Sequence, residues 1–260
     1  MRERAKKEEK MKENREKEIL SFLEKEGYAK ISRISKELFI SESTARRNLS
    51  ELEQKGLINR THGGAELKKH DSLVLSFAFR SNQNASEKKR IALTALKLIH
   101  NGDVVFLDGS STAFYLAEYL TEFKDVKVIT NGIDTLSLLS KNGVTVYSTG
   151  GVASRENPSV LVGHYAEQMI QSVHADIFFF SAQSVSRNGD VYDCYEDEIS
   201  PRKKMMQNTD KSVLLLDSTK TERSSAFRLG NVTEFDYIVC NKDLKDRFDC
   251  EDLPEFITFE

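Results

Sequence analysis

The sequence predicts an α/β protein in two parts, a small helical domain followed by a larger domain with a mostly parallel sheet. Three observations predict this organisation. Short amphipathic helices fill the first part, strand and helix patterns alternate from about residue 87 onward, and the charge changes sign between the parts. Residues 1–70 hold 18 Lys and Arg against 13 Asp and Glu, whereas residues 71–260 hold 20 against 28. The basic first part therefore concentrates a potential that attracts polyanions.

Composition excludes several classes of protein. A chain of 260 residues with 39% hydrophobic residues can bury a real core, so global disorder is not expected. No apolar run of eighteen residues and no signal-peptide pattern occur, which predicts a cytoplasmic location with no membrane partner. The three cysteines and five histidines show no disulfide framework and no metal-ligand spacing, so we expect neither a metal nor a cofactor.

The expected domain boundaries follow these patterns. Residues 1–14 form a charged extension, residues 15–68 the first domain, residues 69–85 a linker and residues 86–260 the α/β domain. The extension alternates Lys or Arg with Glu, which is typical of a solvated helix.

Two short helices are expected at the start of the first domain. The first covers residues 16–26 and ends at Gly27; its apolar face is Ile19, Leu20, Phe22 and Leu23. Ser32 is expected to cap the second helix, with Ile40 packing after it. Its apolar residues are Ile34, Leu38 and Phe39.

A third helix is expected from its N-cap Ser41 to Gly56. One stripe at i, i+4 and i+7 is apolar and should be buried: Ala45, Leu49 and Leu52. The opposite face carries Ser43, Arg46, Arg47 and Ser50. Two adjacent arginines with small hydroxyl side chains suit a DNA major groove, because Arg reaches guanine O6 and N7 or a phosphate, and Ser contacts either.

A basic hairpin follows the third helix, with its turn expected at residues 60–64. Helix, helix, turn, helix and hairpin form the winged helix-turn-helix plan, whose last helix enters the major groove. The DNA contacts are expected from Ser43, Thr44, Arg46, Arg47, Arg60 and His62. Two alternatives stay open: a three-helix module for protein interaction, and an N-terminal extension that acts as an arm on DNA phosphates.

This segment resembles the DNA-binding signature of the DeoR family of bacterial transcriptional repressors. The resemblance covers about residues 15–65 and rests on the run RRNLSELEQKGLINRTHGGA with the preceding ISRISKELFISEST. The family usually has Asp where this chain has Asn48, and a β-branched residue where it has Ala45. The loss of a charge at Asn48 is expected to alter operator preference.

The second domain alternates strands and helices, which predicts βαβ units, a mostly parallel sheet and helices on both faces. Strands are expected at residues 104–107, 126–130, 144–148, 177–180, 213–216 and 237–240. Helices are expected at residues 87–100, 112–120, 133–139, 165–171 and 199–207. In such sheets ligands bind beyond the carboxyl ends of the strands.

The loop after the first of these strands, residues 108–112 with the sequence DGSST, leads directly into a helix. Glycine, hydroxyls and free helix N–H groups make an anion site that suits a phosphate. The alternative is that Ser111 or Thr112 only caps the helix. Small polar residues and glycines also follow three further strands, and Lys220 adds an ammonium group at the last of them. Although Lys220 alone could be a solvated loop lysine, the four loops together favour a sugar-phosphate pocket.

The second domain also resembles the effector-binding domain of the DeoR family, over about residues 84–241. The matching segments are NGDVVFLDGSST, VITNG, STGG, VLVGHYAE and VLLLDSTK. That domain is related in fold to ribose-5-phosphate isomerase, glucosamine-phosphate deaminase and coenzyme A transferases. The resemblance implies that the effector phosphate is bound by Ser110, Ser111 and Thr112, assisted by Lys220, and that the sugar pocket is shaped by Asp108, Asn131 and Gly151. Two departures are Thr221, where the family has an aromatic residue, and the loop 181–184, which lacks glycine.

An enzyme on this fold needs a general acid or base at the pocket. The loop after strand 177–180 contains no carboxylate, and Asp193, Glu196, Asp197 and Glu198 are interpreted as an acidic first helical turn. We therefore expect a repressor of a carbohydrate-utilisation operon, not an enzyme, that binds double-stranded operator DNA as a homodimer or homotetramer and is released by a phosphorylated sugar. Two alternatives are a sugar-phosphate isomerase-like enzyme with a DNA-binding head and a constitutive DNA-binding protein.

Overall fold

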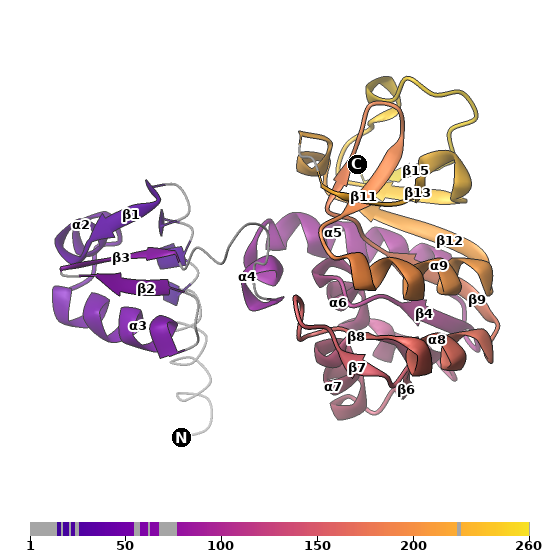
Figure 1. Ribbon diagram of the computed structural model, residues 1–260, viewed down its shortest axis with the longest axis horizontal. Helices are drawn as coiled ribbons and strands as arrows, with labels where there is room; N and C mark the ends of the chain where they lie inside the picture. Colours follow the sequence, from indigo (N-terminus) through magenta and orange to yellow (C-terminus); the bar gives the residue numbers. More distant parts are fainter. Residues whose placement is uncertain are drawn as a thin grey trace. The chain divides into compact units, whose positions relative to one another are not determined.

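The chain divides into two compact units, residues 1–83 and 84–260 (Figure 1). The computed structural model describes residues 15–16, 18–20, 22–23, 26–54, 58–61, 63–67, 77–222 and 225–259. The predicted extension 1–14, Gly56 and residues 69–76 of the predicted linker lie outside these residues. Helix α4 (Phe77–Asn82) lies within the segment that was expected to be a linker.

The first unit combines helices with a three-stranded antiparallel sheet of order β1-β3-β2. The described residues among 15–26 are helical, as predicted. They are followed by β1 (Tyr28–Lys30), α2 (Ile31–Glu37), α3 (Glu42–Gln54), β2 (Ile58–Thr61) and β3 (Gly64–Leu67). Fully buried side chains from all three helical segments form one core: Ile19, Leu23, Ile34, Leu49 and Leu52.

Two predictions for the second helix are wrong. Helix α2 begins at Ile31, so Ser32 is not its cap; Lys30 holds the cap position and makes no side-chain cap. Phe39 lies beyond the helix with φ +51° and is 96% exposed, so it does not belong to the apolar face. The chain enters a left-handed conformation at Phe39 in order to turn from α2 into α3.

The hairpin after α3 is tighter than predicted. Arg60 and Thr61 belong to β2, and Thr61 pairs with Gly64 across a two-residue connection. Gly63 has φ +86°, a conformation that favours glycine. Gly64 is required by close packing, because a Cβ there would lie 2.5 Å from the carbonyl oxygen of Ala29 on β1.

The second unit contains a seven-stranded sheet in which every neighbouring pair is parallel. Its order is β15-β14-β12-β9-β4-β5-β6. The strands are β4 (Val104–Leu107), β5 (Lys127–Thr130), β6 (Thr145–Ser148), β9 (Ala175–Phe180), β12 (Thr209–Leu216), β14 (Tyr237–Cys240) and β15 (Glu255–Thr258). The chain builds the sheet from β4 in one direction and from β9 in the other. The topological switch point, where such sheets bind ligands, therefore lies between β4 and β9.

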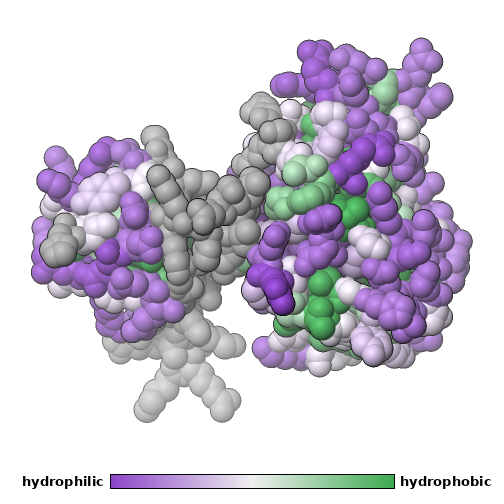
Figure 2. Space-filling model, in the orientation of Figure 1, coloured by the Kyte–Doolittle hydropathy of each residue, from purple (hydrophilic) through white to green (hydrophobic). Residues whose placement is uncertain are grey.

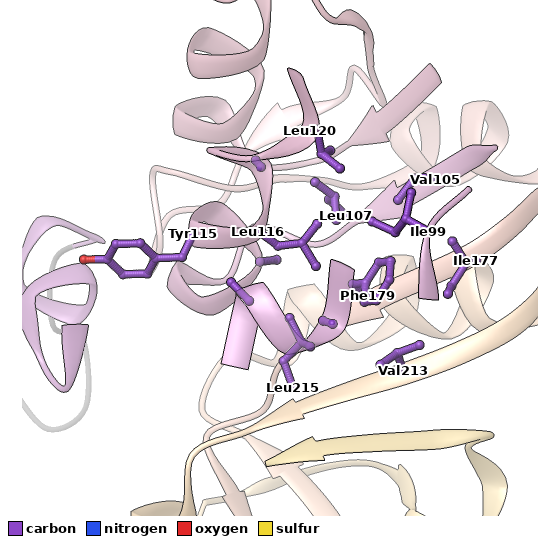
Figure 3. Packing of buried hydrophobic residues seen from close by; sticks show 14 of the residues in the cluster. Ile99, Val105, Leu107, Tyr115, Leu116, Leu120, Ile177, Phe179, Val213 and Leu215 are labelled. Atoms are coloured by element: carbon purple, nitrogen blue, oxygen red, sulfur yellow. The ribbon is translucent and has the colours of Figure 1, made fainter. Parts of the chain in front are cut away.

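Helices cover both faces of this sheet, as predicted. One core packs α5 (Ala85–Ala95), α6 (Ser111–Ala117) and α7 (Ile133–Lys141) against alternate strand residues such as Leu107, Phe179 and Leu215 (Figure 3). The other core packs α8 (His164–Gln171) and α9 (Ile199–Gln207) against the intervening residues, including Phe106 and Phe178. Side chains that alternate between two apolar layers explain the continuous apolar runs of these strands.

Several short elements were not predicted. They are the edge strand β15 of the main sheet, a small antiparallel sheet of β10 (Ser184–Val185), β11 (Asp190–Asp193) and β13 (Phe227–Asn231), and a hairpin of β7 (Val152–Ala153) and β8 (Leu161–Val162). The two-residue strands β7, β8 and β10 are too short to show a period in the sequence. Short 3₁₀ helices complete the unit: η1 (Leu96–Leu98), η2 (Leu120–Glu122), η3 (Glu196–Glu198), η4 (Ser218–Glu222), η5 (Val232–Glu234) and η6 (Lys245–Arg247).

The visible face of the second unit is largely hydrophilic, with small apolar patches (Figure 2). None of the helices in the described part of the chain is both long enough and apolar enough to cross a lipid bilayer.

We expect Phe179→Ala to lower the free energy of unfolding by about 3–5 kcal/mol, because it opens a cavity at a fully buried position of the central strand β9. Tyr147→Ala, on the edge strand β6 where the side chain is 48% exposed, should cost less than about 1 kcal/mol. Urea unfolding followed by circular dichroism measures both; equal losses would contradict the assignment of the core.

Candidate DNA interface and candidate effector site

The first turn of α3 is organised by Ser41. The backbone N–H of Thr44 donates to Ser41 Oγ at 3.1 Å, which confirms Ser41 as the cap. The Ser41 hydroxyl also lies 2.8 Å from the hydroxyls of Ser43 and Thr44. The predicted apolar stripe is fully buried: Ala45, Leu49 and Leu52. Ser43, Arg46 and Arg47 are therefore exposed on the opposite face.

Both arginines of this face form ion pairs along the helix. Arg46 Nη2 lies 2.9 Å from Glu42 Oε2, and Arg47 Nε lies 3.5 Å from Glu51 Oε1. Exposed pairs of this kind contribute little free energy, so both guanidinium groups can exchange their carboxylate partners for DNA. Arg60 Nη1 donates to Ser50 Oγ at 2.8 Å and so joins the hairpin to α3. His62 lies outside the described residues.

Asn48 does not lie on the exposed face. Its side chain is 5% exposed, and its Nδ2 donates to the carbonyl oxygen of Thr44 at 2.9 Å. The expectation that Asn48 changes the charge of a DNA-facing surface is therefore wrong, because the amide is used inside the domain.

At the switch point, Asp108 joins the carboxyl ends of β4 and β9. Its Oδ1 accepts from the N–H of Ser110 at 3.0 Å, and its Oδ2 accepts from the N–H of Ser181 at 3.2 Å. The carboxyl group is fully buried. This burial raises the pKa of Asp108, although the charge of Arg202 and the hydrogen bonds act against the increase.

Arg202, on α9, lies at the centre of a buried charge network that the sequence analysis missed. Its guanidinium group contacts Asp193 Oδ2 at 2.5 Å, Glu198 Oε2 at 2.6 Å and Asp108 Oδ2 at 3.3 Å. Asn157 Nδ2 donates to the other oxygen of Glu198 at 2.5 Å. Every carboxylate oxygen of the network thus accepts at least one bond. The sequence feature that could have indicated part of this network is the spacing of Glu198 and Arg202, because residues four positions apart on a helix can form an ion pair.

Asp193 lies in β11 and not in the predicted acidic helical turn, whereas Glu198 lies in that turn, η3, as predicted, but is buried against Arg202. Burial acts to raise the pKa of Asp193, but Arg202 outweighs it and holds that pKa below its usual value. Burial likewise opposes the charge of Arg202, and the three carboxylates outweigh it and raise the pKa of Arg202. Glu196 and Asp197 are exposed in η3, as a solvated turn requires.

The loop after β4 carries the predicted hydroxyls. Ser110, rather than Ser111 or Thr112, caps α6, because its Oγ accepts from the N–H of Ala113 at 3.2 Å. Ser111 Oγ accepts from Lys88 Nζ at 3.0 Å. Lys88, on α5, is only 5% exposed and was not predicted as a site residue. The sequence did contain a sign of this burial. Lys88 lies three positions before Ile91 and four before Ala92, so it belongs to the same face of the helix as these apolar residues.

Lys220 lies near the ends of β9 and β12. Its Nζ donates to Ser181 Oγ at 2.7 Å, and Ser181 Oγ donates to the carbonyl oxygen of Leu215 at 2.6 Å. Lys220 and Asp108 thus both contact Ser181. Two predicted site residues, Asp108 after β4 and Lys220 after β12, thus meet at Ser181, which follows β9 and was not predicted as a site residue.

Four buried polar atoms in the segments that follow β4, β5 and β9 have no hydrogen-bond partner in the described structure. They are Thr112 Oγ1, Asn131 Oδ1, Thr135 Oγ1 and Ser184 Oγ. Buried polar groups are nearly always bonded to protein, water or a ligand. Thr135 and Ser184 were not predicted as site residues.

A segment that includes β7 and β8 covers the ends of β4 and β5. Asn131 and Leu161 are joined by two hydrogen bonds, at 2.8 Å and 3.3 Å. Val160 packs on Gly109 so closely that a Cβ there would lie 2.4 Å from Val160 Cγ2. Asp108, Thr112 and Asn131 are inaccessible to solvent in this arrangement.

The covering segment consists of residues 152–162, and Gly151 directly precedes it. The φ of Gly151 is +98°, and a Cβ would lie 2.4 Å from the carbonyl oxygen of Val162. Backbone geometry alone thus requires glycine here. A cavity of about 660 Å³ is lined by residues 152–156, Val162, Glu196 and Asp197, beside the covering segment. Among the described residues, no three His, Cys, Asp or Glu side chains group as metal ligands.

We expect Arg202→Met to lower the free energy of unfolding by about 3–5 kcal/mol, because it leaves three buried carboxylates without their cation. Arg228→Met is the control: Arg228 is 50% exposed and pairs with Asp190 at the surface, so its loss should cost less than about 1 kcal/mol. Thermal and urea unfolding measure both; similar small losses would show that the buried network contributes no stability.

Comparison with known proteins identifies both units. The family model described as the DeoR C terminal sensor domain matches residues 83–242, and the model described as the DeoR-like helix-turn-helix domain matches residues 15–71. The L-fucose operon activator of Haemophilus influenzae is 34% identical over 229 residues, which cover 88% of this chain and 91% of that protein. The transcriptional repressor GlcR of Bacillus subtilis is 31% identical over 225 residues, 86% of each chain.

Among solved structures, ribose 5-phosphate isomerase A of Methanocaldococcus jannaschii is similar, with a TM-score of 0.41 and 19% identity. The similarity covers 53% of this chain and 55% of that one, so it spans only about half of the isomerase. The two family matches and the 34% identical relative extend over both units. The chain therefore belongs to the DeoR family of helix-turn-helix transcriptional regulators of sugar operons, a family of regulators and not of enzymes.

Proposed function

We propose that this protein represses a carbohydrate-utilisation operon and leaves its operator when a phosphorylated sugar binds at the switch point of the sheet. The family membership already excludes the alternative of an isomerase-like enzyme with a DNA-binding head. GlcR of Bacillus subtilis is named a repressor, which supports the direction of control proposed here.

The exposed face of α3 supports the proposed DNA contacts. Arg46 and Arg47 read bases or phosphates, and their assistants are Ser43, Thr44, Arg60 and His62. The buried stripe fixes which side of α3 faces outward, and Arg60 is held near that side by its bond to Ser50. The protein acts on paired half-sites as a homodimer or homotetramer, since symmetric operators require two heads.

One observation carries the sensing half of the proposal: unpartnered buried polar atoms gather where β4, β5 and β9 end. Such atoms are costly unless something binds them. Lys88 and Lys220 supply positive charge next to Ser111 and Ser181, which suits a phosphate. In this proposal Ser110, Ser111 and Thr112 bind the phosphate, while Asp108, Asn131 and Gly151 shape the sugar pocket.

The covering segment links binding to control. Residues 152–162 close the strand ends, so an effector enters only when this segment moves. Asn157 ties the same segment to Glu198 and through it to Arg202 and Asp108. An effector that binds the open arrangement better shifts the population toward it, and this shift is the proposed signal to the DNA-binding unit.

Activation is a second candidate, because the 34% identical relative from Haemophilus influenzae is named an operon activator. Repression and activation predict opposite changes in operator affinity when the sugar phosphate is added. A repressor releases operator DNA when the sugar phosphate is added, whereas an activator of the opposite linkage binds it more tightly.

We expect Arg47→Ala to weaken specific operator binding by about 1–3 kcal/mol if Arg47 reads a base. The variant Arg228→Ala, on the other unit, should bind operator like the wild type. Fluorescence anisotropy with operator and unrelated DNA at one salt concentration measures the difference. A uniform loss on both DNAs would reassign Arg47 to a phosphate contact, and no loss would remove it from the interface.

We expect at least one phosphorylated pentose or hexose to release operator DNA from the wild-type protein. Lys220→Met should then raise the concentration needed for half-release about 10- to 150-fold, the effect of losing one hydrogen bond to a charged group. Lys211→Met, near the amino end of β12, is the matched control and should change nothing. If a panel of phosphorylated sugars leaves the wild-type complex intact, the sensing proposal is wrong.

A further inference from the structure

Thr135 is a fully buried residue in the first turn of α7, just beyond the carboxyl end of β5. Its Oγ1 has no hydrogen-bond partner in the described structure. Side chains of a helix lean toward its N-terminus, which here points the threonine back toward the strand ends. A Cβ on Gly132 would lie 3.2 Å from Thr135 Oγ1 and 2.9 Å from Gly109 Cα. The hydroxyl therefore lies beside the contact between the loops that follow β4 and β5.

Two other buried threonine hydroxyls of this unit, one beside the site and one outside it, are satisfied. Thr130 Oγ1 accepts from the N–H of Gly132 at 3.0 Å, and Thr94 Oγ1 donates to the carbonyl oxygen of Arg90 at 2.9 Å. Thr112 and Asn131, in contrast, share the unpartnered state of Thr135. Helix α6, which carries Thr112, packs against α7. Asn131 and Thr135 lie on either side of Gly132, which packs on Gly109 just before α6. The three residues with unpartnered atoms thus follow two neighbouring strands that are in contact at their ends.

The chemistry of Asn131 and Thr135 differs from that of the proposed phosphate site at Ser110–Thr112. Asn131 Nδ2 donates to the carbonyl oxygen of Leu161, so the free atom of this amide is the oxygen, which only accepts. A phosphate dianion has no proton to donate to it, whereas a sugar hydroxyl both donates and accepts. Asn131 and Thr135 carry no charge, and the buried ammonium of Lys88 contacts Ser111 at the phosphate end instead.

We propose that Thr135 is a specificity-determining residue of the effector site and hydrogen-bonds a hydroxyl group on the carbon chain of the sugar. This inference rests on the proposed function, and it divides the site into a phosphate end at Ser110–Thr112 and a hydroxyl-reading end at Asn131 and Thr135. The effector class is accordingly a polyhydroxylated sugar phosphate, and a deoxy analogue that lacks the recognised hydroxyl binds more weakly.

The test compares full-length wild type with Thr135→Val, which replaces the hydroxyl by a methyl group of nearly the same size. The probes are ribose 5-phosphate, glucose 6-phosphate, fructose 6-phosphate, fructose 1-phosphate and inorganic phosphate. We expect Thr135→Val to keep operator binding and to keep or raise the Tm, since no bond is lost. It should need at least 10-fold more of the active sugar phosphate for operator release, while the Tm shift caused by inorganic phosphate stays as in the wild type.

Two further variants make the result specific. Thr135→Ser keeps the hydroxyl and should keep the wild-type response to the sugar phosphate. Thr94→Val removes a bonded hydroxyl outside the site, so it should lower the Tm and leave the response unchanged. If Thr135→Val does not fold, Thr135→Ser compared with Thr135→Ala measures the hydroxyl instead.

Each outcome decides the inference. If wild type responds and Thr135→Val responds equally, Thr135 holds only a buried water and the inference is wrong, although the proposed function stands. If Thr135→Ser loses the response as fully as the valine variant, packing and not the hydroxyl is responsible, which also overturns it. If no sugar phosphate acts on the wild type, the proposed function fails and the inference with it.

Discussion

The contact across the switch point, between Asp108 at the end of β4 and the N–H of Ser181 at the end of β9, is the constraint on which the rest of the second unit depends. At this point the connections that leave the two neighbouring parallel strands run in opposite directions and leave a crevice between them. A buried carboxylate bridges it at a cost in desolvation, and Arg202 offsets that cost by also binding Asp193 and Glu198. This network holds the loop 108–112 in place. The candidate site therefore depends on the buried charges of Arg202, Asp193 and Glu198, which do not themselves belong to the loop.

The same network explains how a buried pocket can be sensitive to a ligand. It reaches the covering segment through Asn157, the loop after β4 through Asp108 and the helix α9 through Arg202. These are separate parts of the sequence held by short, directional, charge-assisted bonds. Movement of the covering segment therefore changes the surroundings of Glu198 and, through Arg202, of the loop that carries Ser110 to Thr112.

Strong periodicity made much of the fold predictable. Strand β4 begins and ends where the apolar run begins and ends, and Ser41 caps α3 because a hydroxyl precedes the amphipathic run. Phe39 was misplaced because its left-handed φ leaves no mark on hydrophobic spacing. Lys88 was missed because its partner Ser111 is 23 positions away. Arg202 has Glu198 four positions away, but its contact with Asp108, 94 positions away, joins it to the site, and sequence alone does not show that such distant residues are close in space.

Hydrogen–deuterium exchange of the full-length protein, with and without the sugar phosphate that acts on its operator complex, tests the central claim most directly. We expect changed exchange in residues 108–112, 130–135 and 154–162, since these segments form the site and its cover. Unchanged exchange in all three segments, with the ligand's effect confined to another region such as the cavity lined by Arg187 and Arg247, would contradict the account.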